Sequence, residues 1–251
     1  MNRNGEVGFR QRIQLDWLER TAQLYSAGLT KGEIEESLQV LLRDRFSIGS
    51  NAKRGNRALT ISILLKVWVA VPSGLESLRD DGLELLIQLP LKEHLVVHWG
   101  MVIAVYPFFQ VLAETVGRLL RLQGSVAASQ VQRRMREQFG ERSTVERATR
   151  RTLRCLIYWR VLKETQEKGI YQATPSIPII DTKLAAWLIE ASLIASGSAS
   201  GTLRAITQNP ALFPFTTELI NIRRLETHGR LELLRQGLDE DVIMLRGGVA
   251  R

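Results

Sequence analysis

The sequence predicts a mainly α protein with an N-terminal helical bundle, a winged helix-turn-helix bearing a small β-hairpin wing, and a C-terminal helical extension. Three observations support this prediction. Apolar residues make up 45% of the 251-residue chain, enough to bury a sizeable core. They recur at helical spacing through roughly the first 120 positions. Beyond Gly124 the patterns follow in the order helix, turn, helix, hairpin, which is the outline of a winged helix. The predicted regions are 1–123, 124–180 and 181–251.

The bundle begins with two predicted helices. Residues 11–27 have an amphipathic pattern that Gly28 ends. Thr30 starts the next helix, and Glu33 three residues later is the partner that completes a capping box. We expect this second helix to end near Arg45.

Three further helical patterns complete the bundle. A polar, basic connector precedes an apolar helix over residues 57–71, which ends before Pro72. Residues 75–89 and 91–122 predict further helices, and Pro107 is expected to kink or split the second of them.

One uncharged stretch raises the question of a membrane span. Residues 95–113 contain no Asp, Glu, Lys or Arg over 19 positions, close to the minimum for a spanning helix. Pro107 interrupts the stretch and charged residues crowd both ends. We therefore expect a buried pair of core helices and no membrane insertion.

The winged helix-turn-helix is predicted from four short patterns. Residues 125–139 and 143–159 are helical, separated by a short turn. Residues 161–163 and 170–172 are strand-like, and the polar turn 165–169 between them ends in glycine. The two strands are the expected wing.

The C-terminal extension has the weakest pattern. Asp181 is placed to cap a helix that runs through Ile194, and the small residues of 196–201 form a linker. We expect a short strand and a helix in the remainder.

The second helix of the predicted winged helix separates into an apolar and a basic side. Ser143 is its expected N-cap, with Glu146 at the capping-box position. At about 100° per residue, one side collects the apolar and small residues. The other side holds four arginines at the spacing i, i+3, i+4, i+7, here called the arginine face: Arg147, Arg150, Arg151 and Arg154.

The arginine face predicts binding to double-stranded DNA by a non-enzymatic protein. Like charges one turn apart repel, whereas guanidinium groups pair with phosphate oxygens. From residue 121 to 160, ten arginines outnumber three glutamates, giving +7 against +8 for the whole chain. The second helix of a helix-turn-helix lies in the major groove. The predicted nucleic-acid-binding residues are Arg133, Arg134, Arg142, Thr144, Arg147, Arg150, Arg151, Arg154, Lys168, Lys53, Arg54 and Arg57.

Two alternatives remain open at this stage. A winged helix also serves as a protein-protein module, so the chain fits a scaffold or adaptor subunit. The basic charge is equally compatible with an RNA-binding factor. The sequence leaves the oligomeric state open.

The sequence predicts no catalytic, cofactor or metal site. His94 and His98 have the i, i+4 spacing of metal ligands, but no third ligand is evident, so two half-buried, hydrogen-bonded histidines are expected. Cys155, the only cysteine, falls on the apolar side of its helix and is expected to pack there. A single cysteine and the lack of a signal-peptide pattern favour a cytoplasmic location.

The order of elements resembles that of the BrxA family of BREX phage-defence systems, which are small, helical DNA-binding proteins. The shared layout is a helix pair, a basic segment with an apolar helix (50–71), a helical middle, and an arginine-rich helix that runs into a strand (142–162). The resemblance covers the chain up to Ala173. It implies a DNA-binding component of a bacterial anti-phage system that cooperates with other defence proteins.

Overall fold

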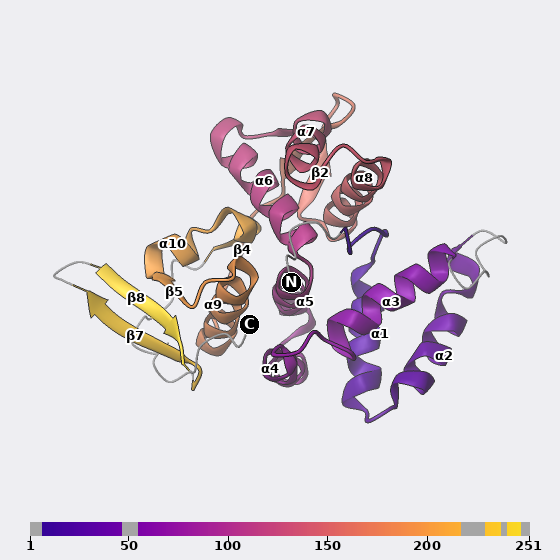
Figure 1. Cartoon of the computed structure of the whole chain (residues 1–251), viewed down its shortest axis with the longest axis horizontal. Coiled ribbons are helices and arrows are strands. Elements are labelled where there is room, and N and C mark those ends of the chain that lie inside the picture. The colour runs from indigo at the N-terminus through magenta and orange to yellow at the C-terminus, as the bar shows by residue number, and fades with distance from the viewer. Residues whose placement is uncertain (1–6, 47–54, 217–228, 237–239, 247–251) are drawn as a thin grey trace.

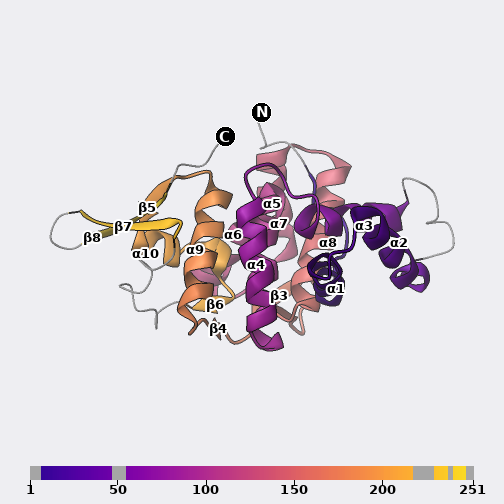
Figure 2. The same cartoon turned by 90° about the horizontal axis from the view of Figure 1, so that it is seen from below.

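The computed structural model describes residues 7–46, 55–216, 229–236 and 240–246, and it is mainly helical. Helices α4, α5 and α9 lie in the middle of the molecule (Figure 1). Helices α1 to α3 lie at one end, and the C-terminal strands β7 and β8 lie at the other (Figure 2). Helices α6 to α8 form a third group above the centre in Figure 1.

The helices of the predicted bundle are present. The capping box is confirmed: the Thr30 hydroxyl accepts from the Glu33 amide, and the Glu33 carboxylate accepts from the Thr30 amide. The second helix ends four residues before Arg45, and a 3₁₀ turn follows. The elements are α1 (Leu15–Ser26), α2 (Lys31–Leu41), η2 (Arg43–Arg45), α3 (Asn56–Trp68), α4 (Glu76–Gln88), η4 (Leu91–Glu93), α5 (His94–Val105) and α6 (Pro107–Gln123).

Pro107 splits the apolar stretch as predicted. Helix α5 ends at Val105 and α6 starts at Pro107, because proline fits the first turn of a helix but not its interior. Among the described residues, no single helix is long and apolar enough to cross a membrane. In the described part of the chain, one pair of helices, Leu91–Val105 and Pro107–Gln123, passes that test together, and it is bent by 117°. Nearly all of α5 is buried inside the protein.

The middle third contains two helices and a small antiparallel sheet. The sheet has the order β1-β3-β2, in which Val126 pairs with Tyr171 and Lys163 pairs with Gln172. The expected hairpin is therefore formed. The prediction for residues 125–139 misses the strand β1, which pairs with a strand more than 40 residues later. The elements are β1 (Val126–Ala127), α7 (Ala128–Phe139), α8 (Ser143–Tyr158), β2 (Leu162–Glu164) and β3 (Ile170–Ala173).

The C-terminal region is only partly the helical extension that the sequence predicts. Asp181 caps α9 by accepting from the Leu184 amide, as expected. The prediction misses a three-stranded antiparallel sheet with the order β5-β8-β7. Its strands form because residues far apart in the sequence pair and bury Leu231 and Ile243 against α9. The elements are β4 (Ile177–Pro178), α9 (Thr182–Ser196), β5 (Ser200–Thr202), α10 (Leu203–Thr207), η5 (Pro210–Leu212), β6 (Phe215–Thr216), β7 (Leu231–Gln236) and β8 (Glu240–Leu245).

Buried tryptophans join these regions into a continuous core. Trp99 on α5 contacts the rings of Phe109, Trp159 and Phe215. Each indole N–H that reaches a distant carbonyl fixes two elements together, as Trp159 does with Ile13. Gly100 allows α9 to approach α5, since a Cβ there would lie 2.3 Å from the Trp187 ring. This core positions α8 relative to the rest of the chain.

Candidate nucleic-acid interface

Helix α8 has the two sides that the sequence predicts. The apolar side is buried: Val145, Ala148, Thr149, Thr152, Leu153, Cys155 and Leu156, followed by Trp159. On the opposite side Arg147 and Arg150 are exposed, and Arg151 and Arg154 are half-buried. The arginine face is therefore helical and turned outward.

The start of α8 differs from the prediction. Ser143 is already a helical residue, and Arg142 is the N-cap, with extended backbone angles and no side-chain cap hydrogen bond. The predicted capping box of Ser143 and Glu146 is therefore wrong. The Arg142 guanidinium donates to the Phe139 carbonyl across the turn between α7 and α8. Arg142 thus helps to hold the turn, and its side chain is only in part available to a ligand.

The four arginines of the arginine face differ in their partners. Arg154 forms an ion pair with Glu164 on β2, at 2.6 Å. Arg151 donates to the Arg10 carbonyl at 2.9 Å, and Arg147 donates to the Ser143 carbonyl at 3.3 Å. Within the described part of the chain, neither Arg147 nor Arg150 forms an ion pair with a carboxylate. These two guanidinium groups are exposed cations, and Glu146 on the same helix pairs with neither of them in the described part of the chain.

Two arginines that the sequence analysis missed lie next to this face. Arg10 and Arg12 are exposed, on the segment 9–13 that runs along α8 before α1 begins. Burial lowers the pKa of Arg151, and the nearby charges of Arg12, Arg147 and Arg150 lower it further. Arg12 therefore lies within electrostatic reach of the arginine face, although about 140 residues separate them in the sequence.

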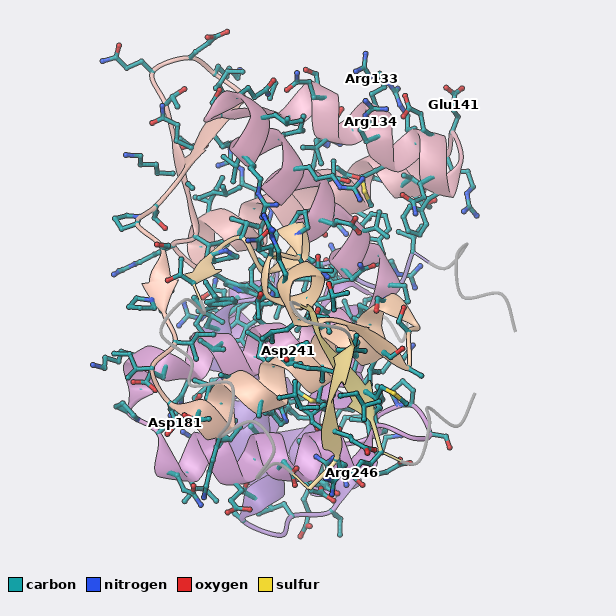
Figure 3. All side chains as sticks on the ribbon, turned by 90° about the vertical axis from the view of Figure 1, so that its left-hand side faces the viewer. Arg133, Arg134, Glu141, Asp181, Asp241 and Arg246 are labelled. Atoms are coloured by element: carbon teal, nitrogen blue, oxygen red, sulfur yellow. The ribbon has the colours of Figure 1, made fainter. Side chains whose placement is uncertain are left out.

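The arginines of α7 are placed differently. Arg133 and Arg134 are exposed, but both pair with Glu137 one turn along the helix, at 3.8 Å and 3.1 Å. Figure 3 shows these two arginines at an outer edge of the molecule, with Glu141 nearby. The two predicted site residues on α7 thus share one carboxylate partner within their own helix, which offsets part of their charge.

The other predicted site residues are spread over the chain. Thr144 is exposed on the first turn of α8, and Lys168 is exposed in the turn between β2 and β3. Arg57 lies half-buried in the first turn of α3. Lys53 and Arg54 fall outside the described residues.

The histidine pair forms a buried polar contact. His94 Nδ1 and His98 Nε2 both lie within 2.9 Å of one carboxylate oxygen of Glu19, on α1. Burial alone would raise the pKa of Glu19, but the hydrogen bonds and charges of both histidines lower it to about 2. Both rings are more deeply buried than expected. Among the described residues, no group of three or more His, Cys, Asp or Glu is arranged to hold a metal ion.

The single cysteine serves packing. Burial raises the pKa of the Cys155 thiol to about 12, so it is not a thiolate at neutral pH. Its sulfur accepts from the Ile13 amide and donates to the Gln11 carbonyl.

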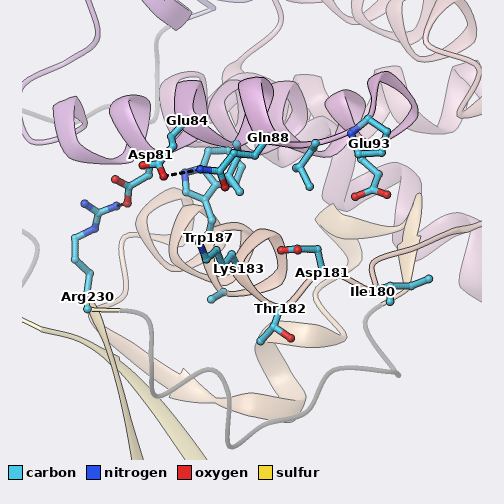
Figure 4. A pocket seen from close by; sticks show the side chains of 15 residues that line it. Asp81, Glu84, Gln88, Glu93, Ile180, Asp181, Thr182, Lys183, Trp187 and Arg230 are labelled. Carbon is cyan, nitrogen blue, oxygen red and sulfur yellow. Dashed lines mark hydrogen bonds and ion pairs between the residues drawn. The ribbon is translucent and has the colours of Figure 1, made fainter.

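A cavity of about 1130 Å³ lies between α4 and the start of α9. Figure 4 shows Arg230 with Asp81 at one end and Glu93 and Asp181 at the other. Arg230 bonds to Asp81 and to the buried Glu190, while Asp181 caps α9. Asp81, Asp181 and Glu190 therefore already have structural partners.

Comparison of the chain with family models, with curated proteins and with solved structures found no match.

Proposed function

We propose that this protein is a non-enzymatic binder of double-stranded DNA that uses the arginine face of α8. The observation that carries the proposal is the exposure of Arg147 and Arg150 without a carboxylate partner. Guanidinium groups pair strongly with phosphate oxygens, including in bidentate geometry. The arginine face extends from Arg147 to Arg154, roughly 10 Å along the helix, a length that fits one groove of a duplex.

We further propose that residues 124–180 act as a winged helix-turn-helix. Support comes from the order α6, β1, α7, α8 and hairpin, with β1 completing the small sheet. In this arrangement α8 is the recognition helix, and the turn between β2 and β3 brings Lys168 toward a neighbouring groove. Thr144 and Arg147 lie nearest its N-terminal end, the part that meets the bases in a helix-turn-helix.

The biological setting is proposed on the resemblance alone. A place in a bacterial anti-phage defence system, with other defence proteins as partners, agrees with the shared layout up to Ala173. Deleting the gene from a host that carries such a system should lower its resistance to phage. Unchanged phage titres would contradict this setting and leave the DNA-binding proposal intact.

The test of function is competition binding. A labelled duplex of about two helical turns is titrated with the protein at salt concentrations between about 50 and 200 mM. We expect binding that weakens steeply with salt, because each phosphate contact releases counterions. Stronger competition by RNA would favour an RNA-binding factor. No retention of any nucleic acid at low salt would contradict the proposal and favour the adaptor alternative.

A further inference from the structure

The segment 9–13, here called the N-terminal arm, is fixed to α8 by a series of hydrogen bonds. Its carbonyls at Phe9, Arg10 and Ile13 accept from Thr152, Arg151 and Trp159, at 3.3, 2.9 and 2.9 Å. Cys155 adds two contacts, to the Gln11 carbonyl and the Ile13 amide. The arm is therefore held through its backbone, and these contacts do not depend on its arginine side chains.

The side chains of the arm alternate in their burial. Phe9, Gln11 and Ile13 are at most 3% exposed, whereas Arg10 and Arg12 point outward. This period of two is that of an extended chain, whose successive side chains point to opposite sides. The packing of the inner three residues thus fixes the side on which both arginines emerge.

The outward side of the N-terminal arm adjoins the arginine face of α8. Arg151 reaches from α8 to the Arg10 carbonyl, and Arg12 contributes to lowering the pKa of Arg151. Within the described residues Arg10 and Arg12 form no ion pair with a carboxylate, so their charges add to those of Arg147 and Arg150. The Arg12 charge therefore lies next to the arginine face, and Arg10 emerges on the same side of the arm, two residues earlier.

We propose that the N-terminal arm is part of the nucleic-acid interface, with Arg10 and Arg12 as a second row of phosphate contacts beside α8. This inference rests on the proposed function. An extended chain beside a helix sets two rows of cations side by side, so the arm widens the contact along the phosphate backbone. The arm contributes affinity for the duplex of any sequence, because phosphate contacts carry no base information.

The test compares the salt dependence of duplex binding in three proteins: the parent chain, the variant Arg10→Ala/Arg12→Ala, and a control. The control Lys31→Ala/Arg43→Ala removes the same amount of positive charge from α2 and the turn after it. These elements lie beyond α1 and α3, away from α8 (Figure 1). We expect the slope of log affinity against log salt to fall by about two in the arm variant, one for each lost contact. The control should keep the parent slope.

Folding is checked separately. Thermal unfolding of the arm variant should match the parent, because the arm's buried side chains and backbone hydrogen bonds are retained. A second variant, Arg10→Lys/Arg12→Lys, keeps both charges and should keep the parent slope.

The outcomes separate the two proposals. An arm variant with the parent slope overturns the role of the arm and leaves the arginine face as the interface. An equal fall in the control also overturns it, since net charge alone would then explain the effect. A parent chain that binds no duplex overturns the arm and the proposed function together.

Discussion

Helices α7 and α8 are neighbours with a similar number of arginines, but they differ in how many of these arginines form ion pairs. On α7, Glu137 lies one turn from Arg133 and Arg134 and pairs with both. On α8, Arg147 and Arg150 are exposed with no ion pair among the described residues. Arginine content alone therefore does not locate an interface.

The difference shows which charges remain for a ligand. Repulsion between like charges at i, i+4 costs a few tenths of a kcal/mol per pair, and an acid in the next turn relieves it. On α7 the acid Glu137 lies near the C-terminal end of the helix and pairs with both arginines. On α8 the acid Glu146 lies in the first turn and forms no ion pair among the described residues. In the proposed function, the phosphates of a duplex supply the negative charge that the exposed arginines of α8 lack.

The largest expected effect on duplex affinity comes from parallel substitutions of exposed arginines on α8 and on α7. Arg147→Glu/Arg150→Glu should weaken duplex binding on the order of a thousandfold, because two contacts are lost and two repulsive charges are added. Arg133→Ala/Arg134→Ala should change the affinity by less than about threefold, because those arginines are already paired. Fluorescence anisotropy with a labelled duplex measures both.

Circular dichroism serves as the control for this pair, since all four side chains are exposed and neither variant should lose helix. An α7 variant that loses as much affinity as the α8 variant would remove the distinction between the helices.

The protein interior offers a further comparison with the exposed arginines. A buried side chain there stays ionised only when hydrogen bonds or opposite charges stabilise it. Glu19 has a pKa of about 2 in the folded state, below its ordinary value of 4.5. Its contribution to stability is therefore present above pH 4.5 and is lost as the pH falls toward 2. For this half-buried group we expect about 2 kcal/mol at neutral pH.

Urea unfolding of the parent and of Glu19→Gln, at neutral pH and near pH 2, measures this contribution. The variant should be less stable at neutral pH, and the two proteins should converge in acid. A constant difference in the free energy of unfolding between the two proteins across this pH range would show that the Glu19 charge does not contribute to stability.

The smallest expected effects come from removing the acids that pair with arginines. Glu164→Gln releases Arg154 on α8, and Glu137→Gln releases Arg133 and Arg134 on α7. We expect the first to tighten duplex binding roughly twofold to fivefold, since exposed ion pairs are worth about 1 kcal/mol or less. The second should tighten it less, because the arginines that it releases lie on α7 and not on the proposed recognition helix. The same anisotropy titration ranks the two, and a larger gain from Glu137→Gln would place α7 in the interface.

Predictions that depend on neighbouring residues agree with the structure. The Thr30 capping box, the Asp181 cap and the division at Pro107 are all present. The buried and exposed sides of α8 also follow from spacing alone, because a helix repeats its direction every 3.6 residues.

Predictions that depend on distant residues were incomplete. Strand β1 was read as helix because its partner β3 lies far along the chain, and β7 was missed for the same reason. The expected Ser143 cap failed because α8 begins one residue earlier, with Arg142 at the N-cap. The alternation of uncharged residues and arginines over 9–13 could have predicted an extended N-terminal arm. It could not have predicted which helix the arm packs on.

The sequence by itself determined the helical character, the main helix boundaries, and the amphipathic division that turns four arginines to one side of α8. Those properties follow from local geometry and the burial of apolar side chains. Only the tertiary structure decided which arginines stay unpaired, that Glu19 lies between two histidines, and that Arg10 and Arg12 adjoin α8. The physical reason is that charges act through space, and folding brings together groups whose separation along the chain carries no information about their distance.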